Sequence, residues 1–221
     1  MGNNRMMNLI SVNVGLPREI FWKDRVITTG IFKEPVPRRV AVRKHNLDGD
    51  RQADLKVHGG PEKAVYAYPS EHYDFWRGEL PGVDLPWGMF GENFTTEGLM
   101  EIEVNVGDRF RIGTTTLMVT QPRMPCFKLA AKFNRDDIIK RFLDSRRSGL
   151  YLAVIEEGEV GVGDVIERVH RDGNDISIAD VVKFYTGGAE DRDWLSRATR
   201  HAALPEGWRK HFQKQLEKNV L

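Results

Sequence analysis

Apolar and polar positions alternate in short runs along the first three quarters of the chain, and this period of two is typical of β-strands. The pattern predicts strands at residues 9–14, 28–32, 39–42, 64–68, 102–106, 109–112, 116–120 and 150–155. A Gly- and Pro-rich stretch at 81–91 predicts a loop. Many short strands with few long helices favour a β-barrel over a parallel sheet.

Three short helices are predicted among the strands. Ser70 is a suitable N-cap for a helix at 71–76, and a second helical stretch at 128–133 follows Cys126. Asn134 is expected to cap a helix at about 135–146, with Gly149 in the left-handed position beyond its end.

The pattern changes near residues 171–174, and three helix-like segments follow it. Ser177 caps the first, at 178–185, while the second covers 191–201 and the third runs from Pro205 towards residue 216. Isolated helices of this length are marginal, so they are expected to pack together as a subdomain. The predicted fold is α+β and predominantly β, with a barrel at 8–170 and a three-helix subdomain at 175–221.

Composition narrows the function classes. The 221 residues are 40% hydrophobic and 29% charged, with a net charge of +1, so no global field favours nucleic acid or an anionic membrane. No apolar run approaches the ~20 residues that span a bilayer, and residues 1–15 lack signal-peptide features. The expectation is a soluble cytoplasmic protein that binds neither nucleic acid nor membrane.

Cys126 is the single cysteine, which excludes an intramolecular disulfide and a zinc site built from several cysteines. It lies in the segment TQPRMPCFKL at 120–129, where Pro122 and Pro125 restrain the loop between a strand and a helix. A helix N-terminus and the nearby Arg123 and Lys128 favour the thiolate, which attacks electrophiles and binds soft metals. The alternative is a buried structural cysteine.

Two further segments have residue types that suit a ligand. In the first, at 49–64, His58, Gly59 and Gly60 precede Lys63, and such a turn can present backbone N–H groups and a charge to an anion. The second, at 87–99, has the Gly, Asn and Thr content to hydrogen-bond a heterocycle. Taken alone, the composition of each segment favours a plain turn or surface loop over a binding site.

Other chemistries are weaker. The chain has no GxGxxG after a strand, no Walker A motif and no HExxH. A nucleophilic triad of Cys126 with His58 or His72 and an aspartate stays open.

Four segments, taken in order, resemble the MOSC domain family, and within it the YiiM subfamily. They are GDRQADLKVHGGPEKAVYAYPSEHY (49–73), FGENFTTEGL (90–99), VGDRFRIG (106–113) and QPRMPCFKL (121–129). The resemblance covers roughly residues 8–170, and the helical tail is similar to the three-helix domain that follows in the same subfamily.

This resemblance implies a barrel that binds the pyranopterin molybdenum cofactor, with Cys126 as the protein's ligand to molybdenum. The implied cofactor-binding residues are Arg38 (with Arg39 as its alternative), Gln52, His58, Gly59, Gly60, Lys63, Gly91, Asn93 and Arg123. Met124 departs from the small residue that often precedes the second proline, which puts the pocket's shape in question but not the ligand.

The chain also resembles, more distantly, the mitochondrial amidoxime-reducing components. This implies an oxidoreductase that reduces N-hydroxylated compounds, such as 6-hydroxylaminopurine or amidoximes, to amines. Cys126 would be catalytic, and Asp54, His58 or Glu92 would deliver protons. One cysteine cannot ligate an iron–sulfur cluster, so electrons would come from a separate reductase protein. The alternatives are a non-catalytic cofactor carrier and a metal-free, cysteine-dependent transferase or hydrolase.

Overall fold

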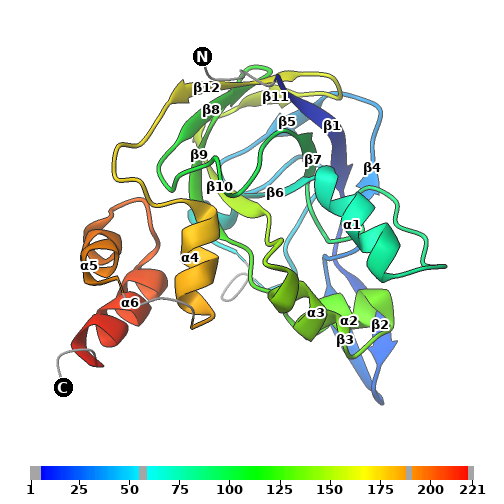
Figure 1. The fold of residues 1–221 in the computed structure, drawn as a ribbon. Helices are drawn as coiled ribbons and strands as arrows, with labels where there is room; N and C mark the ends of the chain where they lie inside the picture. The colour runs from blue at the N-terminus through cyan, green and yellow to red at the C-terminus, as the bar shows by residue number, and fades with distance from the viewer. Residues whose placement is uncertain (1–5, 55–58, 188–190, 219–221) are drawn as a thin grey trace.

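The computed structural model describes residues 6–54, 59–187 and 191–218. Its centre is a closed barrel of seven strands (Figure 1), namely β1 (Met7–Val14), β6 (Val65–Pro69), β7 (Phe94–Glu97), β8 (Arg109–Ile112), β9 (Thr115–Pro122), β10 (Leu150–Glu156) and β12 (Val165–His170). The strand order is β12-β8-β9-β10-β6-β7-β1, and pairing of β1 with β12 closes the ring. The β6–β7 pair is parallel and the other pairs are antiparallel. The predicted barrel is confirmed.

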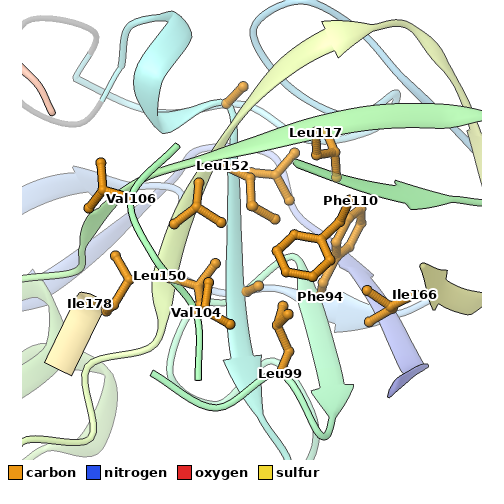
Figure 2. Packing of buried hydrophobic residues seen from close by; sticks show 14 of the residues in the cluster. Phe94, Leu99, Val104, Val106, Phe110, Leu117, Leu150, Leu152, Ile166 and Ile178 are labelled. Carbon is orange, nitrogen blue, oxygen red and sulfur yellow. The ribbon is translucent and has the colours of Figure 1, made fainter. Parts of the chain in front are cut away.

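Apolar side chains from opposite walls fill the barrel interior (Figure 2). Phe94 of β7, Phe110 of β8 and Leu150 of β10 are all fully buried. Each such side chain contributes about 1.5–3 kcal/mol through removal of apolar surface from water. The alternation in the sequence therefore marks the strand faces that build the core.

Five further short strands of the described residues lie outside the seven barrel strands. Strand β4 (Glu34–Pro35) pairs with β1, and β5 (Val40–Val42) pairs with β11 (Gly158–Val160). A hairpin of β2 (Arg18–Trp22) and β3 (Arg25–Thr29) projects from one side (Figure 1). The predicted strand at 28–32 thus ends at Thr29, and β2 was not predicted. The hairpin turns at Lys23 and Asp24, which have φ of 46° and 62°. Turns of this kind are usually recognised by an Asn-Gly pair, which is absent here, so the hairpin was missed.

Three helices cover a second apolar cluster beside the barrel. They are α1 (Glu71–Glu79), α2 (Phe127–Phe133) and α3 (Ile138–Ser145), and a 3₁₀ turn, η1, spans Pro61–Lys63. Trp76 of α1 and Phe142 of α3 pack on Tyr68 and Phe90 in this cluster. The Trp76 Nε1 donates to the Tyr68 hydroxyl at 2.7 Å, so its polar atom is satisfied in the interior.

One predicted strand is absent from the described residues, and one strand of the barrel was interpreted as a loop. Residues 102–106 form turns, with Asn105 in an isolated bridge to Ser177, and Ile102 is 75% exposed. Conversely, β7 lies in the segment that was interpreted as a loop. Its Thr95 and Thr96 are polar yet fully buried between two neighbouring strands, which hides the strand from a hydrophobic pattern.

The helix boundaries around α3 also differ from the prediction. Asn134 ends α2 in the left-handed conformation (φ 50°, ψ 43°), and Asp137 precedes α3. Arg146, with φ 56°, ends α3 in place of Gly149. Gly149 instead begins the approach to β10, where a Cβ would lie 2.5 Å from the Ala67 carbonyl oxygen. Position 149 therefore needs glycine because neighbouring strands pack closely there, and not because a helix ends there.

The C-terminal helices follow the prediction closely. They are α4 (Ile178–Tyr185), α5 (Arg192–Arg200) and α6 (Glu206–Lys218), and the Ser177 hydroxyl caps α4 by accepting from the Asp180 N–H at 3.0 Å. Phe184 and Trp194 stack with ring centroids 4.0 Å apart. These side chains belong to the same apolar cluster as the barrel core, so the helices are packed against the barrel.

Polar contacts also join this helical region to the barrel domain: Trp208 Nε1 of α6 donates to Gln121 Oε1 of β9 at 2.8 Å, and the Ile178 N–H donates to the Val104 carbonyl at 3.0 Å. Across the described ranges, no helix is long and apolar enough to cross a bilayer.

Candidate functional site

A pocket of about 650 Å³, its mouth included, lies where the end of β9 meets α2 and the loops after β3 and before η1. Its lining comes from separated segments of the chain: Thr29, Gly30, Ile31, Lys33, Asp50, Arg51, Gln52, Ala53, Lys63, Tyr66, Gly91, Asn93, Arg123, Met124, Cys126, Lys128 and Tyr151.

The pocket brings together half of the residues that the sequence singled out. Those that line it are Gln52, Lys63, Gly91, Asn93, Arg123 and Cys126. His58 lies outside the described residues. Asp54 is half-buried beside the lining residue Ala53, while Gly59 and Gly60 precede the turn that carries Lys63.

Arg38 is exposed and outside the pocket lining, and so is Arg39. Arg39 instead pairs with Asp164 at 3.0 Å and donates to the Glu159 carbonyl. Its charge is thereby used to join β5 to the loop before β12. The geometry therefore does not support either arginine as a wall of this pocket.

Cys126 occupies the N-cap position of α2, in extended conformation (φ −133°) and without a side-chain cap hydrogen bond. Its carbonyl accepts from the Leu129 N–H at 2.9 Å, which begins the helix. Cys126 is half-buried and lines the pocket, in the loop between Pro122 at the end of β9 and the first residue of α2. The sequence-based placement of Cys126 between a strand and a helix is therefore correct.

Arg123 is only 6% exposed, and its guanidinium lies over the rings of Tyr66 (5.3 Å) and Phe142 (5.2 Å). Burial works against its charge, but neighbouring Tyr66, Tyr151 and Cys126 raise its pKa overall. Within the described residues, its buried Nη1 has no hydrogen-bond partner. A buried donor without a protein partner in a pocket wall is available to an acceptor on a ligand or to a water molecule.

An ion pair of Lys33 and Asp50 lies in the same wall, and neither residue was among the predicted site residues. Their side chains are 9% and 1% exposed. Asp50 also accepts from the Gly15 N–H at 3.0 Å and from Asn93 Nδ2 at 2.9 Å. Burial lowers the pKa of Lys33, and Asp50 opposes that shift. Asp50 belongs to the GDRQ segment, whereas nothing in the local sequence singled out Lys33.

Glu92 lies outside the pocket lining and is fully buried. Its carboxylate accepts from the Gly88 N–H (2.7 Å), the Phe90 N–H (3.1 Å), the Thr95 hydroxyl (3.0 Å) and the Tyr73 hydroxyl. Burial raises its pKa, and these donors act in the opposite direction. The arrangement favours a structural role for Glu92, which organises the loop before β7, over the predicted proton donor.

Lys132 of α2 holds two loops at the pocket wall together. Its ammonium donates to the Ile31 carbonyl at 3.0 Å and to the Gly88 carbonyl at 2.6 Å. Burial lowers the pKa of Lys132 from 10.5 to about 8, although Glu92 opposes this. Gly91, on the second loop, fits closely against Ile31, since a Cβ there would approach the Ile31 side chain to 2.7 Å.

The depressed pKa of Lys132 predicts a specific pH dependence. Between about pH 8 and 10.5 the unfolded chain binds a proton at Lys132 that the folded protein releases, so stability increases with pH in that window. The free energy of unfolding of the wild type minus that of Lys132→Met should therefore rise by about 3 kcal/mol from neutral pH to 10.5. Urea unfolding at each pH measures it. Lys140→Met, at a side chain that is 82% exposed, is the control, and a flat difference for Lys132→Met would contradict the shift.

Comparison with known proteins gives two matching family models: "MOSC domain" over residues 54–167 and "YiiM-like, 3-alpha helix domain" over 176–219. YflK of Bacillus subtilis is 38% identical over 211 residues, which cover 96% of this chain and 95% of that protein. YiiM of Escherichia coli is 34% identical over 189 residues, 85% and 84% of the two chains. A reductase of Gibberella moniliformis is 35% identical over 148 residues, but these make up 26% of that protein and 66% of this chain.

Solved structures share this fold over nearly the whole chain. The structure of YiiM from Geobacillus stearothermophilus superposes with a TM-score of 0.79 and 36% identity, covering 95% of this chain and 99% of that one. YiiM from Escherichia coli gives a TM-score of 0.74 and 28% identity, covering 96% and 92%. The likeness therefore includes the barrel and the C-terminal helices together.

Proposed function

This chain belongs to the MOSC domain family, with a YiiM-like three-helix domain after the barrel, and on that premise we propose that it is a molybdenum-cofactor-dependent oxidoreductase. Its proposed reaction is the reduction of N-hydroxylated compounds, such as 6-hydroxylaminopurine or amidoximes, to the corresponding amines. The observation that carries the proposal is the buried Arg123 guanidinium, with an Nη1 that the described residues leave unpartnered, beside the Cys126 thiol in one pocket.

The pocket's chemistry fits such a cofactor. Five cationic side chains line it, those of Lys33, Arg51, Lys63, Arg123 and Lys128, against one carboxylate among the described lining residues, that of Asp50. This excess of positive charge suits a phosphate-bearing ligand. Cys126 adds the soft sulfur donor that a thiolate-binding metal needs, and it is the single cysteine of the chain.

Six of the lining residues then have a defined task. When bound, the cofactor supplies a metal centre that exchanges two electrons, together with the sulfur ligands that this chain lacks. Cys126 provides the protein's thiolate to that metal. Arg123 and Lys63 neutralise anionic groups, while Gln52 and Asn93 offer amide hydrogen bonds to a heterocycle. Gly91 lets the backbone of its loop approach closely.

The reaction requires partners beyond the cofactor. Conversion of R–NH–OH to R–NH2 and water consumes two electrons and two protons. One cysteine cannot bind an iron–sulfur cluster, so a separate reductase protein is the proposed electron donor. A reducing cytoplasm, where Cys126 stays a thiol, is the proposed setting. Asp54, half-buried next to the pocket lining, and His58 remain the proposed proton donors. The reductase among the relatives supports redox chemistry in general, not this substrate.

Protein made in cells that synthesise the cofactor should contain close to one molybdenum per chain, and it should reduce 6-hydroxylaminopurine or benzamidoxime with an artificial electron donor. Elemental analysis and amine formation measure the two properties separately. Protein loaded with molybdenum that turns over no N-hydroxylated compound would favour a cofactor carrier. Protein that never binds molybdenum would favour a metal-free, cysteine-dependent transferase or hydrolase.

A further inference from the structure

A second hollow lies on a different part of the molecule, between the barrel strands β8, β9 and β12 and the end of α5. It encloses about 1040 Å³, its open mouth included, and shares no lining residue with the pocket around Cys126 among the described parts of the chain. Arg109 of β8 and Arg197 and Arg200 of α5 line it, so we name it the arginine hollow. Its walls come from both the barrel and the C-terminal helices.

The three arginines of this hollow have no carboxylate partner among the described residues. No ion pair or side-chain hydrogen bond engages Arg109, Arg197 or Arg200 in the described part of the chain. By contrast, Arg39 and Arg141 are both paired with carboxylates. Arg197 and Arg200 are three residues apart on α5 and so share one helix face, where like charges repel. An anion in the hollow would relieve this repulsion.

Asp172 is the one carboxylate among the described residues of the hollow, and it does not supply that anion. It accepts from the backbone N–H and the side-chain amide of Asn174, both at 2.9 Å, and contacts His201 Nε2 at 3.2 Å. His201 Nδ1 accepts from the Ala203 N–H at 3.2 Å, so the imidazole hydrogen lies on Nε2 and is donated to Asp172. All three contacts are made by Asp172 Oδ1, and no arginine of the hollow pairs with Asp172 among the described residues, so the lining keeps an excess of positive charge.

We propose that the arginine hollow binds a small phosphate-bearing molecule. Guanidinium groups match phosphate oxygens with two parallel hydrogen bonds, and three arginines line this one concave space. His170, exposed at the rim, adds a further ring nitrogen. An acidic protein surface fits less well, because protein interfaces have an apolar centre and no exposed large hydrophobic side chain of the described residues belongs to this lining. The ligand would contact the barrel and α5 at once.

Titration of the full chain with inorganic pyrophosphate, followed by amide NMR, tests the proposal. We expect shift changes at Gly107, Asn174 and Ala203, the backbone of the hollow. Arg197→Gln/Arg200→Gln should weaken binding at least about tenfold, since each lost guanidinium removes charge-assisted hydrogen bonds. Both side chains are exposed, so the fold should be unaffected. Lys214→Gln/Lys218→Gln on α6 is the matched control, because it removes the same charge outside the hollow.

The other pocket is also cationic, so Lys63→Ala is measured in parallel and should leave the signals of the hollow unchanged. Shift changes confined to Gly91 and Asn93 would place the anion in the Cys126 pocket and overturn the proposal. The proposal is also overturned if the double arginine variant binds pyrophosphate like the wild type, or if the wild type does not bind it at millimolar concentration. Tighter binding of hexaglutamate than of pyrophosphate in the hollow would replace the phosphate ligand with an acidic protein partner.

Discussion

Cys126→Ser should abolish reduction of N-hydroxylated compounds while the apo-protein stays as stable as the wild type. An alcohol oxygen is a harder and poorer metal ligand than a thiolate. Loss of groups that merely support a metal ligand costs about 10–100-fold, so loss of the ligand itself should exceed that. Stability is a separate matter: the cysteine is a half-buried N-cap residue that makes no side-chain cap hydrogen bond. Serine is a preferred N-cap residue and can supply one.

Three measurements on the same preparation check this expectation: molybdenum content, amine formation and urea unfolding of the apo-protein. Cys126→Ala is the companion variant, since alanine offers neither a ligand atom nor a cap. It should match the serine variant in activity and be about 0.5–2 kcal/mol less stable than it. Full activity in the serine variant would remove Cys126 as the metal ligand. Unfolding of both variants would instead indicate a structural cysteine.

Arg123→Met should reduce cofactor retention at least about tenfold with little effect on the apo-protein. A charge-assisted hydrogen bond to an anionic group contributes about 1.5–3 kcal/mol, and Arg123 has a buried donor that the described residues leave unpaired. In the apo-protein the change removes a buried charge, and the cost of desolvating that charge is lost with it, which stabilises the fold. The change also removes the favourable contact of the guanidinium with the Tyr66 and Phe142 rings, which destabilises the fold. These effects have opposite signs, so the free energy of unfolding should change by less than about 1.5 kcal/mol.

Pterin content after extensive dialysis, set beside urea unfolding, tests the Arg123 prediction. Arg123→Lys keeps the positive charge but loses the planar guanidinium with its paired donors. Its cofactor retention should therefore lie between that of the methionine variant and that of the wild type. If Arg123→Met retains the cofactor like the wild type, the anion-binding group is another cation of the pocket, with Lys63 as the next to test. A large loss of apo-protein stability would show that Arg123 serves the core more than the ligand.

The barrel and the helical tail could be predicted because each depends on a local signal. Strand β8 (Arg109–Ile112) and helix α4 (Ile178–Tyr185) have the bounds that alternation and the Ser177 cap predict. The errors occurred where local signals conflict with tertiary context. Asn134 is a good residue for either end of a helix, and its left-handed φ at the end of α2 reflects packing of α2 and α3 against the second apolar cluster.

The candidate site likewise contains residues that the local sequence identified and residues that it did not. Cys126, Arg123 and Lys63 stand in short segments whose proline and glycine content marks them locally, and the resemblance to a known family named the same residues. Lys33 and Glu92 could not be assigned in that way. Lys33 reaches the pocket from a loop beside β4, and its role depends on Asp50, which is 17 residues away in the sequence. Glu92 stands within a quoted motif, yet its carboxylate turns away from the pocket lining to four donors from its own loop, β7 and α1.

By itself, the sequence determined which residue types are available: one thiol, no second cysteine for a disulfide or cluster, alternating strands for a barrel and three capped helices after it. Only the tertiary structure decided which charges meet a partner among the described residues. Arg123 and the three arginines of the hollow have the same side chain as the paired Arg39 and Arg141, and no local pattern separates them. Whether a charge lies next to a carboxylate or an open space depends on strands and helices that are distant in the chain. Charges pair over a few ångströms in space, and their separation in the sequence does not enter.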